Sequence, residues 1–180
     1  MEIMKEKAKI DGRTGVLGII GMPVEHTLSP LIHNTLAEDL HHPLVYVPFP
    51  VALRDRLGDA VKGAFALGVQ GLNVTVPYKK TVIPHLEGLD PLAEKIGAVK
   101  TLVRGRSGYI GHNTDILGLE RALELRGIIL RGRAVILIGA GGAARAAGYL
   151  CADRQVRRLY ILNRTPEKAI ALKEDILASY

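Results

Sequence analysis

The 180-residue sequence is 48% hydrophobic and 4% aromatic, with no tryptophan, which suits one sizeable or two small aliphatic cores. Lysines and arginines exceed aspartates and glutamates by 24 − 18 = 6, a balance that favours anionic partners. A single cysteine, Cys151, excludes an internal disulfide framework and a cysteine-based metal site, and no apolar run reaches the roughly 20 residues of a membrane-spanning helix. The charged first 15 residues lack the apolar core of a signal peptide, so we expect a cytoplasmic protein.

The basic residues are dispersed along the chain, without a basic stripe or interleaved aromatic residues. We therefore expect neither a nucleic-acid nor a membrane partner. A phosphorylated or carboxylated small molecule fits the positive charge equally well. The sequence predicts no oligomeric state.

Short apolar runs alternate with helix-like runs through the first 115 residues. Ser29 and Pro30 are typical of a helix start, and Gly68 of a helix end. Strands are predicted over 16–21, 44–49 and 69–77, helices over 29–40, 53–68 and 116–127, a short helix within 89–99, and a hairpin over 100–115.

The sequence pattern changes in the last third of the chain. An apolar strand, a glycine-rich turn and an alanine-rich helix occupy 132–153, and a strand over 157–164 and a helix over 165–180 follow. This alternation predicts a parallel βαβ arrangement. The predicted fold class is α/β: an N-terminal α/β substrate domain (1–114) followed by a partial, Rossmann-like doubly wound nucleotide-binding domain (115–180). Such a domain usually has two βαβ halves, so we expect the sequence to be part of a longer protein.

The glycine-rich turn reads "IGAGGAARA" over residues 138–146. Gly139, Gly141 and Ala144 fit the dinucleotide-binding pattern G-x-G-x-x-A, between a strand and a helix. Glycines permit a close approach of a pyrophosphate, and the helix start supplies amide donors. The alternative is a turn that only permits tight helix–strand packing.

The end of the next strand determines the type of dinucleotide that we expect. An NAD-binding domain usually has an acidic residue there, whereas this chain has Asn163, Arg164 and Thr165, with Lys168 one helical turn on. A cation and a hydroxyl suit the 2′-phosphate of NADP. Alternatively, Thr165 only caps the helix that begins with Pro166.

The run "NVTVPYKK" places polar residues at a strand end. Asn73 and Thr75 share one face by the strand period of two, and Lys79 follows Pro77. Ligands of open α/β sheets bind at the carboxyl ends of strands, so Lys79 is a candidate to bind an anion or exchange a proton. The alternative is a solvated turn.

Two further motifs carry hydroxyl or carboxylate groups. In "HTLSP", Thr27 and Ser29 are able to donate to a carboxylate, or simply cap the following helix. In "GHNTDILG", Asp115 lies at the predicted domain join, where a carboxylate favours and orients a nearby ammonium group. Capping of the next helix is the alternative role, and Asn113 and Thr114 are equally plausible caps.

The motifs occur in one order: "HTLSP", "GLNVTVPYKK", "GAVKTL", "GHNTDILG", "GAGGAARA" and "NRT". From about residue 16 to the end, this order resembles the shikimate dehydrogenase family. The resemblance implies an NADP-dependent enzyme that interconverts 3-dehydroshikimate and shikimate by hydride transfer, in the chorismate pathway of aromatic amino-acid biosynthesis.

The resemblance also implies roles for individual residues. Lys79 and Asp115 match the catalytic pair of the family. Substrate contacts fall on Thr27, Ser29, Asn73, Thr75 and Lys100. Cofactor contacts fall on Gly139, Ala140, Gly141, Gly142, Ala143, Asn163, Arg164, Thr165 and Lys168, and no metal is implied.

This chain departs from the family pattern at two of these positions. Thr27 stands where serine is usual and keeps the hydroxyl, whereas Lys100 replaces an asparagine and adds a charge. Lys100 keeps open two alternatives, a quinate/shikimate dehydrogenase paralogue and a non-catalytic NADP-binding module. A basic nucleic-acid-binding protein is the remaining alternative.

Overall fold

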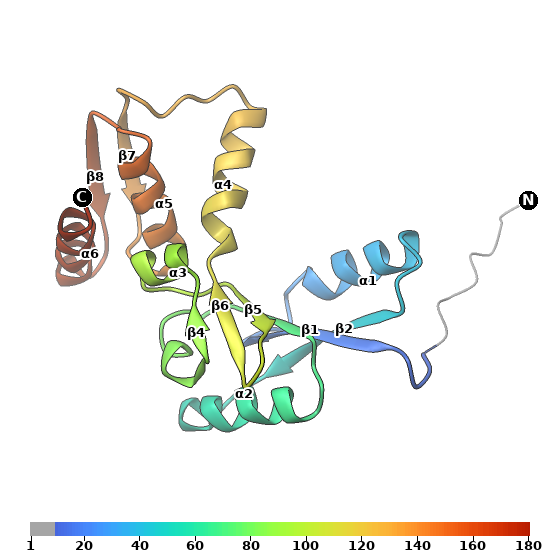
Figure 1. Cartoon of the computed structure of the whole chain (residues 1–180). Helices are drawn as coiled ribbons and strands as arrows, with labels where there is room; N and C mark the ends of the chain where they lie inside the picture. Colours follow the sequence, from blue (N-terminus) through green and yellow to red (C-terminus); the bar gives the residue numbers. More distant parts are fainter. Residues whose placement is uncertain (1–9) are drawn as a thin grey trace, which may run out of the picture. The chain divides into compact units, whose positions relative to one another are not determined.

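The computed structural model describes residues 10–180 and divides into two compact units (Figure 1). Unit 1 comprises the chain up to Gly88 together with Thr101–Ile110, and unit 2 comprises Leu89–Lys100 together with Gly111–Tyr180. The predicted lack of a signal peptide rests mainly on residues 1–9, which lie outside the described residues. The division into functional domains at residue 115 stays a prediction, because compactness does not define a functional boundary.

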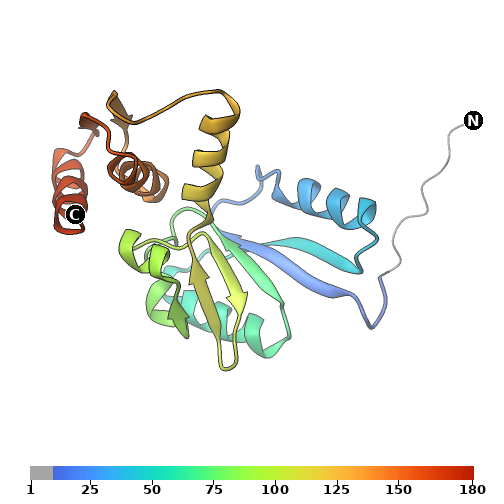
Figure 2. The ribbon, with the colours of Figure 1, turned by 45° about the horizontal axis from the view of Figure 1, so that its top comes forward.

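A mixed sheet organises unit 1, with strand order β2-β1-β3-β5-β6-β4. The sheet is built from β1 (Gly15–Gly21), β2 (Leu44–Pro50), β3 (Gly71–Val74), β4 (Gly88–Leu89), β5 (Thr101–Arg104) and β6 (Tyr109–His112). The helical segments of this unit are α1 (Ser29–Asp39), η1 (Arg54–Arg56), α2 (Leu57–Ala66) and η2 (Ile83–His85). The helices α1 and α2 cover opposite faces of the sheet (Figure 2).

The strand β1 is the centre of a parallel trio, because it pairs in parallel with both β2 and β3. The carboxyl ends of these strands therefore meet at one edge of the sheet. On the other side of β3, β5 pairs antiparallel and begins opposite Asn73. The segments that leave β1 and β3 carry the substrate and lysine motifs predicted from the sequence.

Two predicted elements differ in extent from the observed ones. The strand predicted over 69–77 ends at Val74, because β5 offers no partner beyond Asn73 and the chain turns when Tyr78 N–H donates to the Thr75 carbonyl at 2.9 Å. The helix predicted over 53–68 splits into η1 and α2.

Unit 2 combines helices with a two-stranded parallel sheet of β7 (Ala134–Ile138) and β8 (Arg158–Leu162). Its helices are α3 (Pro91–Ile96), α4 (Thr114–Leu125), α5 (Gly142–Asp153) and α6 (Pro166–Ala178). The helix α5 is central, because it packs against α3, α4, α6 and β7. This is the βαβα arrangement that the sequence predicts.

The core of unit 2 contains a buried arginine of α5. The Arg145 side chain is only 8% exposed, and its Nε donates to the Ile96 carbonyl at 2.7 Å while its Nη1 contacts the Asp175 carboxylate at 2.5 Å. Around it, the hydrophobic core is formed by Ile96, Ala98, Ile116, Ala146, Tyr149, Leu150, Leu172 and Ile176. Because each contact satisfies a donor of the guanidinium group, Arg145 ties α3 and α6 to α5.

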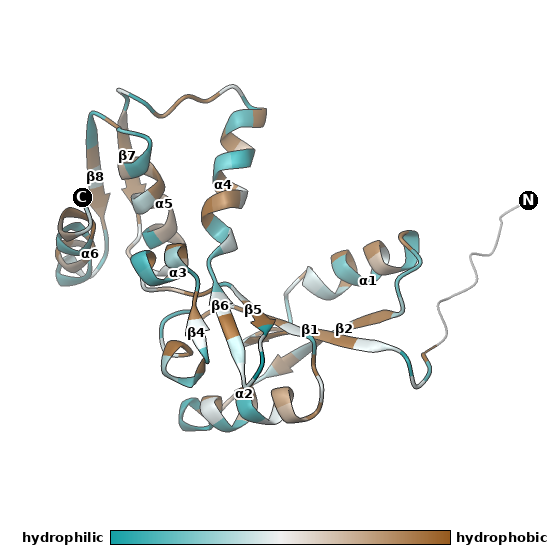
Figure 3. Cartoon of the chain, in the orientation of Figure 1, coloured by the Kyte–Doolittle hydropathy of each residue, from teal (hydrophilic) through white to brown (hydrophobic). Residues whose placement is uncertain are grey.

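One face of the small sheet in unit 2 is apolar and exposed. The strand β7 is hydrophobic along its whole length (Figure 3). Its residues Ile136 and Ile138, with Tyr160 and Leu162 of β8, are 48–83% exposed, whereas the intervening residues are half-buried. Within residues 10–180, no helix is both long enough and apolar enough to cross a membrane.

The end of β1 owes its close packing to a glycine. A Cβ atom at Gly21 would lie 2.3 Å from Cγ2 of Thr75 and 2.9 Å from Cγ1 of Val24. The missing side chain therefore lets the segment after β3 approach β1, where Thr75 N–H donates to the Ile20 carbonyl at 2.9 Å.

We expect Gly21→Ala to lower the free energy of unfolding by about 1–3 kcal/mol, because overpacking must displace Thr75 or β1. Gly63→Ala is the matched control, since Gly63 lies inside α2 with open space around it. There, the better helix propensity of alanine should stabilise the chain by about 0.5–1 kcal/mol. Urea unfolding followed by circular dichroism measures both changes, and an equal midpoint for the two variants would contradict the close approach at Gly21.

Candidate functional site

Two hydroxyl groups gather at the start of α1. Thr27 Oγ1 donates to Ser29 Oγ at 3.1 Å and accepts from Ser29 N–H at 3.3 Å. The N-cap position itself is Leu28, whose side chain makes no cap. Both hydroxyl residues are half-buried. The capping role weighed from the sequence is therefore limited to one backbone bond from Thr27.

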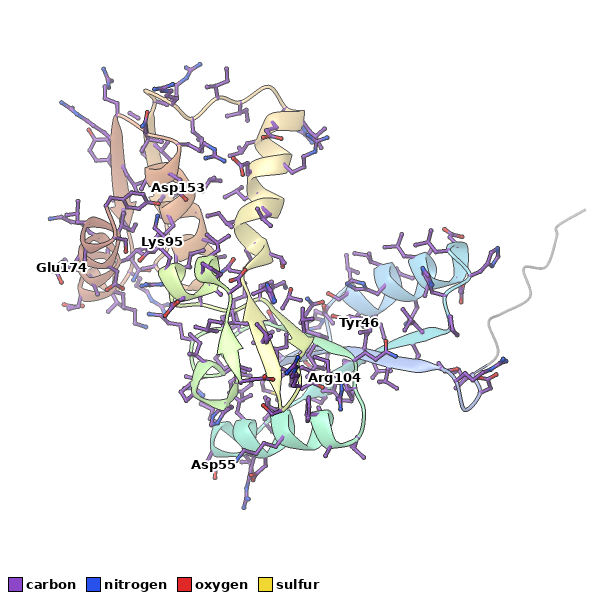
Figure 4. All side chains as sticks on the ribbon, viewed as in Figure 1. Tyr46, Asp55, Lys95, Arg104, Asp153 and Glu174 are labelled. Atoms are coloured by element: carbon purple, nitrogen blue, oxygen red, sulfur yellow. The ribbon has the colours of Figure 1, made fainter. Side chains whose placement is uncertain are left out.

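The helix α1, which begins at Ser29, is held against β2 by residues of its second turn. The Asn34 amide accepts from Tyr46 N–H at 2.7 Å and donates to the Tyr46 carbonyl at 3.0 Å. The His33 ring stacks on the Tyr46 ring, with centroids 4.3 Å apart and an interplanar angle of 9°. Tyr46 thus lies between α1 and the sheet (Figure 4).

The Tyr46 hydroxyl orients a predicted substrate residue. It donates to Asn73 Oδ1 at 2.7 Å, and Asn73 Nδ2 in turn donates to Thr101 Oγ1 at 3.2 Å. The Tyr46 residue is 4% exposed, and burial raises the pKa of its hydroxyl to about 12, although a hydrogen bond with Ser29 lowers it. The chain of contacts links the start of α1 to β3 and β5.

These side chains line a concavity of about 250 Å³ in unit 1, whose polar lining includes His33, Tyr46, Asn73 and Thr101. Leu17, Leu72 and Leu102 add apolar surface. A few convergent polar groups on an apolar base are the lining that small-molecule sites have, and the volume lies just below their usual range of about 300–1,000 Å³.

The turn after β3 places Lys79 next to a buried anchor. The Tyr78 residue is 1% exposed, and its hydroxyl donates to the Val51 carbonyl at 2.5 Å. Met22 N–H also donates to the Val76 carbonyl at 3.0 Å, which joins this turn to the segment after β1. Lys79 is half-buried and Lys80 is exposed, so the two adjacent lysines have different environments.

In unit 2, Asp115 lies in the first turn of α4 and is half-buried. The cap of α4 is Asn113, whose Oδ1 accepts from Asp115 N–H at 3.2 Å and whose Nδ2 donates to the Ala98 carbonyl at 2.9 Å. Of the three caps that the sequence left open, Asn113 therefore occupies the N-cap position, and the catalytic role of Asp115 stays a prediction. Lys100, also half-buried, donates its N–H to the His112 carbonyl at 2.8 Å.

The glycine-rich turn lies between β7 and α5, as the motif requires. Gly139 has a φ of 115°, a conformation that favours glycine, and Gly141 is the N-cap of α5 with open space around it. No side chain caps α5, and its first turn contains no acidic residue. The turn residues Ala140, Gly142 and Ala143 complete a helix start that suits a phosphate.

The segment after β8 is held by a local hydrogen bond. Asn163 Nδ2 donates to the Thr165 carbonyl at 2.8 Å, and Thr165 occupies the N-cap of α6 without a side-chain cap bond. Arg164 and Lys168 are exposed. The plain capping role that the sequence allowed for the Thr165 hydroxyl is therefore absent.

The structure groups the predicted residues in two sets. Thr27, Ser29, Asn73, Thr75 and Lys79 belong to unit 1, and Lys100, Asp115 and the predicted cofactor residues belong to unit 2. That Lys79 of unit 1 and Asp115 of unit 2 act together as a catalytic pair stays a prediction. Sequence reasoning missed Tyr46, Asn34 and Thr101, and only the hydroxyl or amide of each residue offered a signal.

Comparison with known proteins supports the same assignment. Residues 19–102 match the family model of the shikimate dehydrogenase substrate binding domain. The NADP(+) shikimate dehydrogenase of Desulforamulus reducens is 48% identical over 173 residues, which are 95% of this chain and 59% of that protein. That of Thermococcus kodakarensis is 47% identical over 164 residues, which are 91% of this chain and 58% of that protein.

The chain belongs to the shikimate dehydrogenase family. A family member solved in complex with NADP+ is similar with a TM-score of 0.89 and 40% identity, over 96% of this chain and 59% of that chain. The Thermus thermophilus enzyme, solved with NADP(H) and shikimate, has a TM-score of 0.82 and 34% identity, over 91% of this chain and 61% of that chain. The α/β fold with a Rossmann-like part is confirmed, and the chain spans about 59% of the length of these relatives.

Tyr46 predicts a pH dependence of stability. The unfolded phenol titrates near its ordinary pKa of 10.0, whereas the folded one titrates near 12, so the folded state retains a proton that the unfolded state loses. We therefore expect the stabilisation to be complete below pH 10 and to fall between pH 10 and 12. Tyr46→Phe should flatten this fall in unfolding free energy, whereas Tyr160→Phe, which removes an exposed hydroxyl, should not. Parallel curves for Tyr46→Phe and the unmodified chain would contradict the burial of the Tyr46 hydroxyl, which is the cause of its raised pKa.

Proposed function

We propose that this chain supplies the substrate site and part of the NADP site of an enzyme that interconverts 3-dehydroshikimate and shikimate. The observation that carries the proposal is the hydrogen-bonded group of Ser29, Tyr46 and Asn73, together with the half-buried Lys79 in the turn that follows β3. Hydroxyl and amide groups of this kind suit a small polyhydroxylated carboxylate. The named relatives are NADP(+) shikimate dehydrogenases, which supports the choice of substrate and cofactor.

The substrate carboxylate would accept hydrogen bonds from Thr27 and Ser29 at the start of α1. Asn73 and Thr75 would bind ring hydroxyls, with the Asn73 amide oriented by Tyr46. Lys100, which replaces a family asparagine, would contribute a cation and no acceptor. Its charge favours the carboxylated substrate over an uncharged polyol.

Lys79 is the proposed acid–base group. In the reductive direction its ammonium donates a proton to the ketone oxygen as hydride reaches the carbonyl carbon, and in the oxidative direction the neutral amine takes the hydroxyl proton back. Asp115 would keep Lys79 oriented and favour the ammonium form. NADP, when bound, supplies or accepts the hydride.

The start of α5 and the segment after β8 are the proposed cofactor contacts. The uncapped amides near Gly141 and Gly142 suit a pyrophosphate, since no carboxylate in the first turn of α5 opposes it. Arg164 and Lys168, with Thr165, would bind the 2′-phosphate of NADP, and Asn163 would hold the turn that presents them. Ala140 and Ala143 would contribute small side chains beside the pyrophosphate.

Replacing the lysine tests the catalytic assignment. We expect Lys79→Ala, in the complete gene product, to lower kcat for shikimate oxidation by about 10²–10⁴-fold, because general acid–base catalysis contributes about that much. NADP+ reduction followed by absorbance measures the rate. Lys80→Ala is the matched control, since Lys80 is the exposed neighbour and should retain the unmodified rate.

A Lys79→Ala rate equal to that of Lys80→Ala, with an unchanged pH profile, would remove Lys79 from the mechanism. If neither variant nor the parent oxidises shikimate but the parent binds NADP+, the alternative of a non-catalytic NADP-binding module would replace the proposal.

A second substitution tests the cofactor assignment. We expect Arg164→Ala to weaken NADP+ binding by about tenfold or more while leaving NAD+ binding unchanged, because an arginine–phosphate contact contributes about 1.5–3 kcal/mol. Calorimetric titration of the 180-residue chain measures both affinities. Arg157→Ala, which removes another exposed arginine of unit 2, serves as the control. Equal losses for NADP+ and NAD+ would place Arg164 away from the 2′-phosphate.

A further inference from the structure

A second hollow of unit 1 contains none of the residues assigned to the shikimate site. It has a volume of about 390 Å³, within the range of about 300–1,000 Å³ that is usual for small-molecule sites. Its walls come from α2, from η2 with the two residues that follow it, and from the turn and second strand of the β5–β6 hairpin. We name it the α2 pocket and define it by Lys62, Phe65, His85, Glu87, Ser107 and Tyr109.

The base of the α2 pocket is apolar and rigid. The rings of Phe65 and Tyr109 meet edge to face, with centroids 5.5 Å apart and an interplanar angle of 86°. The Tyr109 hydroxyl is occupied, because it donates to the Val69 carbonyl at 2.7 Å. The guanidinium of Arg104, labelled in Figure 4, lies 3.9 Å from the Phe65 ring centroid and donates to the Phe65 carbonyl at 2.7 Å. Aromatic and aliphatic surface is therefore presented by side chains that are already held in place.

The helix side of the pocket carries nitrogen groups without partners. Among residues 10–180, the side chains of Lys62 and His85 make no hydrogen bond or ion pair. The His85 ring lies against the backbone of α2, where a Cβ atom at Gly58 would be 2.8 Å from its Nδ1. This position is possible only because residue 58 is glycine.

The hairpin side of the pocket carries a carboxylate that is fixed in place. Glu87 Oε2 accepts from Ser107 N–H at 3.1 Å and from Gly108 N–H at 3.0 Å. Its backbone N–H donates to the Tyr109 carbonyl at 2.9 Å. Two amides and the backbone hold Glu87 against the hairpin turn, and it forms no ion pair with Lys62 although both line the same hollow.

The charge pattern selects one class of ligand. A simple anion would meet the Glu87 carboxylate, and a simple cation would meet the Lys62 ammonium. A zwitterion satisfies both groups, and the apolar base between them suits an aromatic or aliphatic side chain. We propose that the α2 pocket binds a free α-amino acid with an apolar side chain, its carboxylate at Lys62 and His85 and its ammonium group at Glu87.

Nuclear magnetic resonance titration of the 180-residue chain with L-phenylalanine tests the proposal. We expect saturable shifts of the Phe65, Ser107 and Gly108 amides at millimolar concentration. Two analogues of phenylalanine test the two charges separately, since 3-phenylpropionate lacks the ammonium group and phenethylamine lacks the carboxylate. Each should bind about tenfold more weakly than phenylalanine, if each charge contributes about 1.4 kcal/mol.

Three variants locate the site. Lys62→Gln and Glu87→Gln should each weaken phenylalanine binding by about tenfold, and the glutamine oxygen at position 87 still accepts the two hairpin amides, which preserves the fold. Lys173→Gln, on the exposed side of α6, is the control and should bind as the parent does.

Absence of saturable shifts at these amides would overturn the proposal, as would equal affinity for 3-phenylpropionate and phenylalanine. Retained affinity in both pocket variants, with melting curves like that of the parent, would also place the ligand elsewhere. None of these outcomes depends on shikimate oxidation. The experiment therefore tests the α2 pocket independently of the proposed function.

Discussion

The buried hydroxyl of Tyr46 is the interaction on which the polar architecture of unit 1 depends. A hydroxyl removed from water must find partners inside the protein, and Tyr46 finds them in Asn73 and Ser29. Since Asn73 accepts through Oδ1, its Nδ2 is directed to Thr101. One desolvated group thus fixes the orientation of side chains on α1, β3 and β5, which are far apart in sequence.

The buried polar groups of the two units are hydrogen-bonded in different ways. In unit 1, neutral hydroxyl and amide groups form a chain beside a hollow. In unit 2, the charged Arg145 is enclosed among helices and donates to a carbonyl and a carboxylate. A neutral chain at a hollow leaves hydrogen-bonding capacity for a ligand, whereas the contacts of the buried guanidinium hold α3 and α6 to α5.

The order of elements was predictable because local signals agree with one another. Glycine and proline mark the turns, and apolar periodicity separates 29–40 as helical from 44–49 as extended, as the structure confirms. The extent of β3 was not predictable, because it depends on where its neighbour β5 begins. Likewise, Tyr46, Arg145 and Glu87 gave no local signal, since their side-chain hydrogen-bond partners lie 12 or more residues away. The catalytic and cofactor roles of the remaining site residues stay predictions.

The side chain of Asn34 has a consequence for solubility. The strand β2 forms the outer margin of the sheet, with β1 as its neighbour on one side. An unshielded margin offers N–H and C=O groups to strands of other molecules, which is a common route to aggregation. The Asn34 side chain hydrogen-bonds both the N–H and the C=O group of Tyr46, as a neighbouring strand would. The contact that positions α1 thereby also discourages intermolecular strand addition at the middle of β2.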